Sequence, residues 1–262
     1  MKKIISITIV CLLLLCIMPI NIFAAEKAYV YLSIEKFSIG QGSILEPTRI
    51  EIGADETVQS LLEKAVASDK LVIVNSQFGD YLDGIKDGDN TQADIPQFIL
   101  DEIKNETVGE RADNGTLSSL DYTSQGGWFY AVNNEAGAVA FGECKVNDGD
   151  VVRILFSVYG YGTDVGFGFD TQTQKSDASY IEMPNRDELI KAIADTKNDK
   201  AVALTVLQNL VSTKSQIDDA VKALNQTTQT PPTGDCLLWV AVTTAFISAV
   251  AFLKLKNKMV RI

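Results

Sequence analysis

The 262-residue sequence contains no histidine. This absence excludes Ser-His-Asp and Cys-His catalysis, imidazole general bases, and zinc or haem iron held by histidine. Cysteine is also scarce. Three of the four cysteines, Cys11, Cys16 and Cys236, lie in the apolar ends of the chain, so the central part contains one. The remaining Cys144 cannot form a disulfide within its own chain, so the central part must fold around a hydrophobic core. We expect Cys144 to be a small buried hydrophobe rather than a nucleophile.

Basic residues are few in the part of the chain that lies between the apolar ends. Residues 26–233 contain 17 Lys and Arg against 33 Asp and Glu, a net charge of −16. A surface of this sign repels the phosphate backbone of nucleic acids. The composition therefore excludes nucleic acid as an expected partner.

The first 25 residues have the three parts of a secretory signal peptide. Lys2 and Lys3 precede an apolar run that extends to Ile20, and small residues end the segment at Ala24 and Ala25. This order of charged start, apolar middle and small-residue exit predicts export and cleavage after Ala24 or Ala25. An uncleaved membrane anchor is the alternative.

The C-terminal segment, residues 227–262, also has three parts. Pro231, Thr233 and Gly234 stand in the motif at residues 230–234, an uncharged run of 18 residues follows at 236–253, and a basic tail occupies 254–262. The run is long enough to span a bilayer, and the basic tail should stay inside the cell. The layout resembles the sortase sorting signal of Gram-positive surface proteins, with Thr230 where Leu is usual. The resemblance implies attachment to the cell wall through Thr233, with sortase as a processing partner; a simple membrane anchor is the alternative.

The order of elements after residue 26 predicts an α+β fold with a mixed sheet. Residues 28–37 alternate apolar and polar side chains, a glycine turn follows at 40–42, and residues 44–52 return as a strand that Pro47 confines to an edge or a bulge. Asp55 is a plausible N-cap for an amphipathic helix that ends near Ser68, and residues 71–74 indicate a short buried strand. One helix across a mixed sheet is the β-grasp arrangement, which we favour over a plain sandwich.

The next segment is polar and rich in turn residues. Asp83, Asp87, Gly88 and Asp94 fall at positions one, five, six and twelve of an EF-hand-like loop, but Ile85 replaces the ligand at position three. A solvated acidic loop is therefore expected rather than a calcium site, and no metal is predicted. A second helix is expected at residues 97–105, followed by an aperiodic loop at 106–121.

The stretch from Gly126 to Gly166 contains the strongest strand signals and most of the aromatic residues with a possible binding role. Residues 128–132 and 151–159 are rich in aromatic and β-branched side chains. Asn133-Asn134 and residues 147–150 tolerate tight backbone geometry, so both are expected to form turns. Asp148-Gly149-Asp150 is expected to launch the second strand rather than to bind a metal.

The polar residues 170–184 have the composition of a linker. Apolar residues then recur at helical spacing over 185–226, which predicts three short amphipathic helices, and Thr213 with Gln216 fits a capping box. Part of the third helix, residues 217–224, resembles the FIVAR-type repeats in the stalks of Gram-positive surface proteins. The resemblance implies a small three-helix spacer between a head at residues 26–169 and the C-terminal segment.

Several short motifs across the head point in one direction when they are taken together. They are Tyr31–Phe37, Ile39–Gly42, Glu46-Pro47, Gly127–Asn134, Asp148–Arg153 and Tyr159–Gly162. With these motifs, residues 30–166 resemble the transcobalamin-like C-terminal domain family of exported bacterial proteins. The resemblance implies a β-grasp-like, ligand-binding fold. The large helical domain that precedes this module in cobalamin carriers does not occur here, and no histidine can ligate cobalt, so cobalamin binding by the module alone is a minority hypothesis.

The candidate ligand-binding residues are aromatic side chains and one amide. Along a strand Trp128 and Tyr130 share a side while Phe129 takes the other, where we expect it to be a core residue. The residues expected to contact a ligand are Trp128, Tyr130, Asn133, Tyr159 and Tyr161. Rings on an exposed face can stack on a flat ligand or a sugar, although for Trp128 packing is equally expected.

The sequence thus predicts a non-enzymatic, cofactor-free module at the cell surface that binds a soluble small ligand, for which a corrinoid-like compound is one candidate. An adhesion or interaction head for a protein or glycan partner is the alternative. An enzyme that uses carboxylates alone, such as a glycosidase, is the third hypothesis. It ranks last because the many acidic residues do not form a recognisable catalytic pair in the sequence.

Overall fold

The computed structural model describes residues 27–226, except residues 105, 113–114, 171–174 and 179–182. The signal-peptide and sorting-signal predictions lie outside the described residues. Within the described part, no helix is long and apolar enough to cross a membrane.

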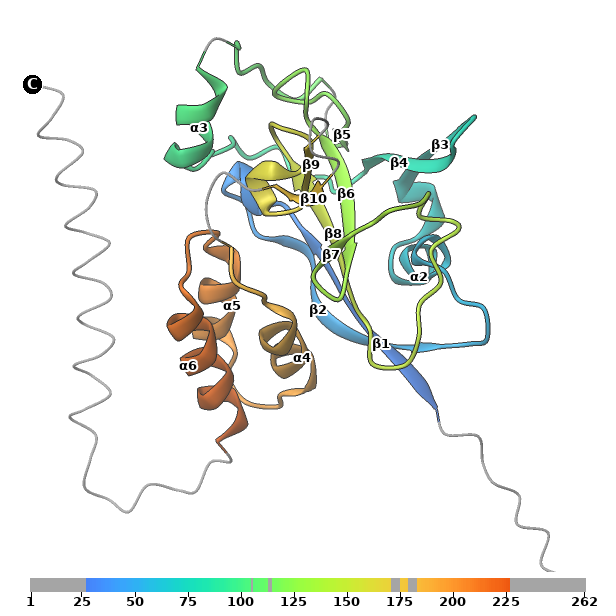
Figure 1. Cartoon of the computed structure of the whole chain (residues 1–262), viewed down its shortest axis with the longest axis vertical. Helices are drawn as coiled ribbons and strands as arrows, with labels where there is room; N and C mark the ends of the chain where they lie inside the picture. The colour runs from blue at the N-terminus through green and yellow to red at the C-terminus, as the bar shows by residue number, and fades with distance from the viewer. Residues whose placement is uncertain (1–26, 105, 113–114, 171–174, 179–182, 227–262) are drawn as a thin grey trace, which may run out of the picture.

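The described chain forms a mixed α+β fold built on a five-stranded sheet (Figure 1). The strands lie in the order β2-β1-β8-β6-β7, with β1 parallel to β8 and the other neighbours antiparallel. Their bounds are β1 Ala28–Glu35, β2 Ser43–Ile52, β6 Gly127–Val132, β7 Glu135–Ala136 and β8 Val151–Ser157. The prediction of a mixed sheet is confirmed, and Pro47 lies in the edge strand β2, beside a shift in the register between β1 and β2.

Helix α2 (Val58–Ala65) covers one face of the sheet, which we call the α2 face. Val30, Leu32 and Ile34 of β1 project to this face and are fully buried with Leu61 and Leu62 of the helix. The alternation of β1 is therefore explained by burial of one side. The N-cap prediction was wrong: Thr57 caps the helix in a reciprocal capping box with Ser60.

Asp55 is instead an exposed residue in left-handed conformation (φ 61°) that pairs with Lys145. Helix α2 ends at Ala65, earlier than expected, and Ser68 belongs to a short 3₁₀ turn, η2 (Ser68–Lys70). This turn leads directly into β3 (Leu71–Ser76).

A second sheet lies beside the first, in a region that the sequence pattern assigned largely to loops. Its three strands are β3, β4 (Gly79–Ile85) and β5 (Leu117–Ser118), in the order β3-β4-β5. The expected loop across residues 75–94 is thus wrong for β4. Its sequence GDYLDGI contains two Asp and two Gly, residues that strands disfavour, and this composition hid the strand. Helix α3 (Gln97–Ile103) follows within the range expected for the second helix, with Ile99 and Ile103 buried.

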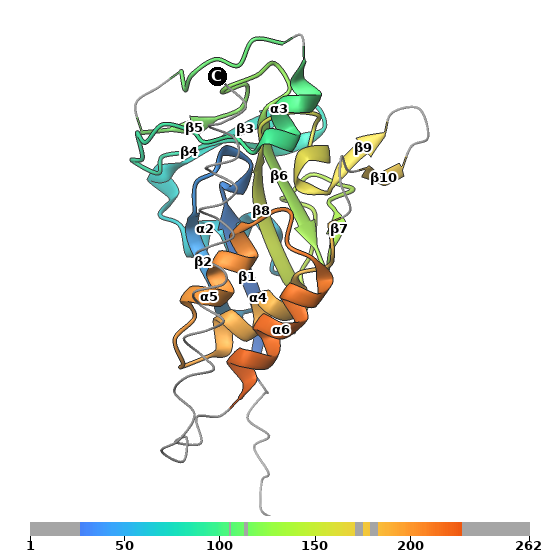
Figure 2. The same ribbon diagram turned by 90° about the vertical axis from the view of Figure 1, so that its left-hand side faces the viewer.

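The three predicted helices are present as α4 (Asp187–Asp195), α5 (Ala201–Gln208) and α6 (Lys214–Asn225). The capping box of Thr213 with Gln216 is confirmed. The helices do not stand apart as a spacer: they cover the second face of the sheet, which we call the three-helix face (Figure 2). Leu189, Ile190 and Ile193 of α4 share one buried cluster with Val151 of β8.

The region expected to be a linker also contains regular structure. Strands β9 (Gly168–Asp170) and β10 (Lys175–Ala178) pair antiparallel as a two-stranded ribbon. Residues 171–174 and 179–182 of the expected linker lie outside the described residues, and residues 183–186 precede α4.

A buried ion pair lies on the three-helix face of the central strands. The guanidinium of Arg153 on β8 donates to both oxygens of Glu35 on β1 at 3.0 and 2.7 Å, and Ser33 Oγ donates to the same carboxylate at 2.6 Å. Both charged side chains are almost completely buried. Burial opposes the charge of Arg153, but the Glu35 carboxylate nevertheless holds the Arg153 pKa above its ordinary value.

A second buried cation holds the helices together. Arg186 is only 1% exposed and donates to the main-chain carbonyls of Leu207, Asn209 and Leu210 at 2.6 to 3.1 Å. These carbonyls lie at the C-terminal end of α5, where helix carbonyls lack partners within the helix. Burial, together with nearby Arg153, lowers the Arg186 pKa to about 10, which still leaves the guanidinium charged at neutral pH.

Arg153→Met tests the role of the buried pair. The substitution leaves the Glu35 carboxylate buried without its cation, so we expect the free energy of unfolding to fall by about 3–5 kcal/mol in urea denaturation. Lys145→Met is the matched control, because it removes an exposed pair and should cost less than about 1 kcal/mol. An equal loss in the free energy of unfolding for the two substitutions would show that the buried pair stabilises the fold no more than the exposed pair.

Leu189→Ala distinguishes a helical unit that is part of the fold from an independent spacer. In a Trp239→Phe background Trp128 is the only tryptophan, so its fluorescence reports on the sheet. Because fully buried Leu189 shares a cluster with Phe156 beneath Trp128, we expect the unfolding transition of the sheet to lose about 2–5 kcal/mol. Val202→Ala, at a position that is 70% exposed, should change it by less than about 0.5 kcal/mol. An unchanged Trp128 transition in Leu189→Ala would contradict the shared core.

Candidate functional site: an aromatic groove along strand β6

Strand β6 positions its aromatic side chains on alternate faces, as the sequence predicts. Trp128 and Tyr130 project to the α2 face and Phe129 to the three-helix face. Trp128 is held in place by its indole Nε1, which donates to the Leu117 carbonyl at 2.9 Å, and by an edge-to-face contact with Phe156 at 5.3 Å between ring centroids. The packing interpretation of Trp128 is therefore correct for much of the ring.

The loop after β7 folds back over Tyr130. The Tyr130 hydroxyl donates to the Val139 carbonyl at 2.6 Å, and Gly137 N–H donates to the Tyr130 carbonyl at 2.9 Å. A Cβ atom at Gly137 would lie 2.0 Å from the ring, so only glycine permits this approach. Burial raises the pKa of Tyr130, and the hydroxyl therefore stays protonated and serves as a hydrogen-bond donor.

A glycine-rich turn after β8 presents Tyr161. Gly160, Tyr161 and Gly162 all have positive φ, and the side chain of Tyr161 is 56% exposed. Tyr161 is a non-glycine residue in left-handed conformation, which persists only where its surroundings hold it. The surroundings here are centred on a buried carboxylate.

That carboxylate belongs to Asp164, which is fully buried. It accepts hydrogen bonds from Ser157 Oγ at 2.6 Å, Val158 N–H at 2.7 Å and Tyr159 N–H at 3.2 Å. Ser157 Oγ in turn accepts from Gly162 N–H at 2.9 Å, so the two side chains close the turn from inside. Burial raises the pKa of Asp164 to about 7, even though these donors favour the charged form.

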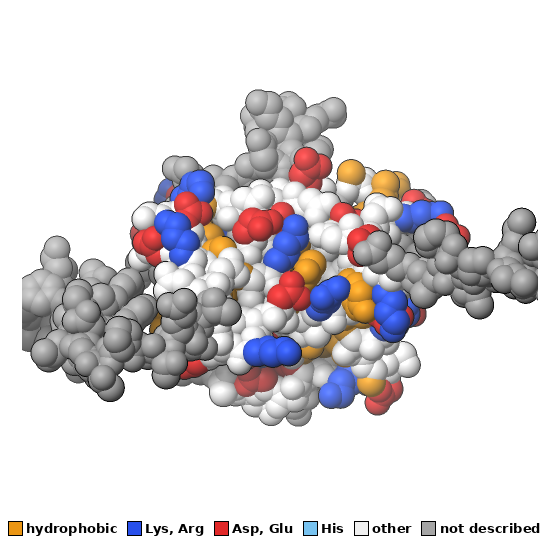
Figure 3. Space-filling view, turned by 90° about the horizontal axis from the view of Figure 1, so that it is seen from below, with side chains coloured by type: hydrophobic (Ala, Val, Ile, Leu, Met, Phe, Trp, Pro, Cys, Tyr) orange, Lys and Arg blue, Asp and Glu red, His pale blue; other side chains and the backbone are white. Residues whose placement is uncertain are grey.

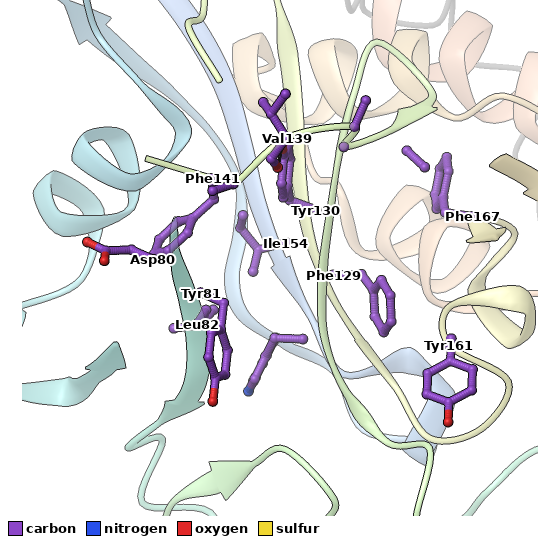
Figure 4. Close-up of a pocket in the computed structure, with 15 residues that line it drawn as sticks. Asp80, Tyr81, Leu82, Phe129, Tyr130, Val139, Phe141, Ile154, Tyr161 and Phe167 are labelled. Carbon is purple, nitrogen blue, oxygen red and sulfur yellow. Dashed lines mark hydrogen bonds between the residues drawn. The ribbon is translucent and has the colours of Figure 1, made fainter. Parts of the chain in front are cut away.

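These elements surround a pocket of about 540 Å³, a volume typical of small-molecule sites. We call it the aromatic groove. Figure 4 shows Phe129, Phe167 and Tyr161 on one side of β6 and Tyr81, Leu82 and Phe141 on the other. The full set of lining residues is Asp80, Tyr81, Leu82, Trp128, Phe129, Tyr130, Ala136, Gly137, Ala138, Val139, Ala140, Phe141, Ile154, Tyr161 and Phe167.

Three of the five predicted ligand-binding residues, Trp128, Tyr130 and Tyr161, line this groove. Asn133 does not: it adopts φ 51° at the turn after β6, donates to Asp150 at 2.7 Å and accepts from Val151 N–H at 3.0 Å. Tyr159 packs against the core beneath the three helices. Both residues serve the local structure in this arrangement, because their side chains lie away from the groove.

The prediction for Phe129 was wrong in the opposite sense, because a residue expected in the core lines the groove. Its side chain is only partly buried. Sequence reasoning also missed Tyr81 and Phe167. Tyr81 lies on the unrecognised strand β4, and Phe167 stands between two glycines directly before β9, where no periodicity marks it.

The chemistry of the groove is that of apolar and aromatic contact. Asp80 is the one charged side chain among the described lining residues, and it accepts from Asn75 Nδ2 at 2.6 Å. Aromatic rings can stack on flat groups or enclose apolar side chains, and main-chain groups in the same groove can orient a ligand.

In the EF-hand-like segment Asp94 is exposed, as a solvated loop predicts, but Asp87 is not. Asp87 is buried between Lys36 Nζ at 2.9 Å and Arg111 at 2.7 Å, so it is neither a solvated residue nor a free ligand for calcium. Lys36 also pairs with Asp89 at 2.7 Å and holds the pKa of that carboxyl well below its usual range. Among the described residues, no group of three or more metal-ligating side chains gathers in one place.

Charged side chains of both signs lie on the surface of the described part. Figure 3 shows acidic and basic side chains interspersed on the face that is seen from below.

Comparisons with known proteins yield little. No family model and no curated protein matches the chain. Among solved structures, a protein from Ruminococcus gnavus described as a candidate metal-binding protein is similar over 50% of this chain and 96% of its own, with 11% sequence identity and a TM-score of 0.28.

The buried carboxyl of Asp164 predicts a specific dependence on pH. The folded chain retains this proton up to a pKa of about 7, whereas the unfolded chain releases it near pH 4, so the free energy of unfolding should fall as the pH rises from about 4 to 7. The slope for this one group is about 1.4 kcal/mol per pH unit. Urea denaturation at pH 5 and pH 7 measures it.

Asp164→Asn is the matched variant for this measurement. It retains an acceptor for the turn but cannot titrate, so the loss of stability between pH 5 and pH 7 should shrink relative to the unmodified chain. The same slope in both chains would show that another group carries the pH dependence.

Proposed function

We propose that the protein is a non-enzymatic binding module, displayed outside a Gram-positive cell, that holds a soluble small ligand in the aromatic groove. The observation that carries this proposal is the groove itself: a volume of about 540 Å³ lined by aromatic side chains from β4, β6 and the turn of Tyr161. The lining offers contact surface and little chemistry, because its one charged side chain is already hydrogen bonded.

A β-grasp-like, transcobalamin-like fold for the head is part of this proposal. Three features support it: the β1–β2 hairpin, the single helix α2 across one face, and the parallel pairing of β1 with β8. The motifs of the sequence resemblance lie in β1, β2, β6 and β8 and in the turns beside them. A corrinoid-like compound is therefore one candidate ligand for the groove, and the chain itself supplies no histidine for cobalt.

The location at the cell surface is proposed from the two ends of the sequence. The signal-peptide pattern directs export, and the segment with Pro231, Thr233 and Gly234 is the substrate that sortase would process. If sorting does not occur, residues 236–253 would retain the chain as a single-pass membrane protein.

A second candidate function is an interaction head for a protein or glycan. It is favoured by the exposure of apolar side chains along the rim, since Tyr161 is 56% exposed, Val139 50% and Tyr81 45%. Exposed aromatic residues are enriched where one macromolecule meets another.

Titration of the Trp239→Phe chain with cobalamin and other flat metabolites tests the first function. Trp128 is then the single indole and lines the groove, so its fluorescence should change on binding. We expect Tyr161→Ala to weaken the affinity by roughly three- to tenfold, because it removes about 1 kcal/mol of aromatic contact. Calorimetry gives the affinities without optical interference.

Phe78→Ala is the matched control, since Phe78 is 81% exposed and does not line the groove. Its affinity should equal that of the parent chain. If no metabolite binds, but immobilised glycans or surface proteins retain the chain and Tyr161→Ala releases it, the interaction head is the correct function. If Tyr161→Ala and Phe78→Ala behave alike with every ligand, the groove is not the binding site.

A further inference from the structure

The main chain of β6 alternates between two neighbours. Asn133 N–H donates to the Val151 carbonyl at 2.9 Å, so the odd-numbered residues of this strand point toward β8. Tyr130 accepts from Gly137 N–H at 2.9 Å on the opposite side. In an antiparallel ladder residues two apart point the same way, so the main-chain groups of Trp128 point outward as those of Tyr130 do.

The outer edge of β6 is closed at both ends and open in the middle. Leu120 N–H donates to the Gly126 carbonyl at 2.9 Å, and Gly137 closes the edge at Tyr130. Between these two points the outward N–H and C=O of Trp128 have no strand partner in the part of the chain that the structure describes. An unpaired N–H and C=O on a sheet edge form a template for another extended chain.

The aromatic groove lies around this opening rather than on one side of it. Figure 4 shows Tyr81 and Leu82 beyond one face of β6 and Phe129 and Tyr161 beyond the other. A flat ligand that stacks on a ring would use one of the two sides. An extended peptide would use both, because its successive side chains project to opposite faces of the sheet.

We propose that the ligand of the groove is a short apolar peptide in extended conformation, which pairs with the main chain of Trp128 as an added strand. The proposal rests on the proposed function and specifies its ligand class. Main-chain hydrogen bonds supply the common part of such binding, and the two aromatic sides select apolar side chains.

The size and charge of the opening limit the peptide further. Gly126 and Tyr130, which carry the closing hydrogen bonds, are four residues apart, or about 13 Å along a strand. A segment of about three residues fits between Leu120 and Gly137, and a longer strand would meet them. The net charge of −16 over residues 26–233 and the presence of Asp80 favour neutral or basic peptides over acidic ones.

Acetylated and amidated tripeptides test this inference by isothermal titration calorimetry with the full chain. The probes carry every combination of Val, Leu, Phe, Tyr and Thr at the three positions. We expect a subset to bind, and Tyr161→Ala to weaken that binding at least threefold while Phe78→Ala leaves it unchanged.

The best-binding tripeptide is then made in two forms that are N-methylated once, at the first or at the second residue. Because alternate N–H groups of a strand point in opposite directions, only one of the two methyl groups can face Trp128. We expect one form to lose affinity at least tenfold and the other to bind as the parent does.

The remaining outcomes separate this inference from the function on which it rests. Equal binding of both methylated forms would overturn strand pairing. If no tripeptide binds while a flat metabolite does so in a Tyr161-dependent manner, the peptide inference is overturned and the binding function stands. If neither class binds, both are overturned.

Discussion

The buried ion pair between Glu35 and Arg153 is the interaction on which the two-sided packing of the sheet depends. It joins β1 to β8, the two central strands, on the face that α4, α5 and α6 cover. An ion pair in such a place overcomes the cost of leaving water only when its geometry is bidentate and further donors complete it, as Ser33 does here. With both faces of the centre covered, the side of β6 away from β8, which the short strand β7 pairs only at Ala131 and Val132, is the part of the sheet left unpaired among the described residues.

Local patterns in the sequence were sufficient for the elements that bury one face. The alternation of β1, the stripe of α2 and the three C-terminal helices follow from periodicity alone, and Thr213 marks the start of α6 correctly. Strand β4 could not be found in this way, because its Asp and Gly residues resemble a loop. The position of the helices on the sheet could not be found either, because it depends on contacts between distant parts of the sequence. The ion pair beneath the helices, for example, joins residues that are 118 apart.

The candidate site shows the same division. Trp128 and Tyr130 were recognised because aromatic residues on a strand carry their own signal, and both line the groove. Whether Phe129 is core or lining depends on which elements cover its face, and Tyr81 and Phe167 come from distant segments without periodicity. An asparagine directly after a strand can either form a turn or bind a ligand, and the sequence does not distinguish these roles. The hydrogen bonds of Asn133 to Asp150 and Val151 show that it is a turn residue.

The interrupted outer edge of β6 has a consequence for the behaviour of many copies at high density. Long, flat sheet edges allow identical molecules to join through their backbones and to grow into fibrils. Here Leu120 and Gly137 leave a gap too short for the edge of another intact sheet, and the opposite edge strand carries Pro47. Neighbouring molecules would therefore not join through either edge of the five-stranded sheet, while a small segment of chain could still enter at β6.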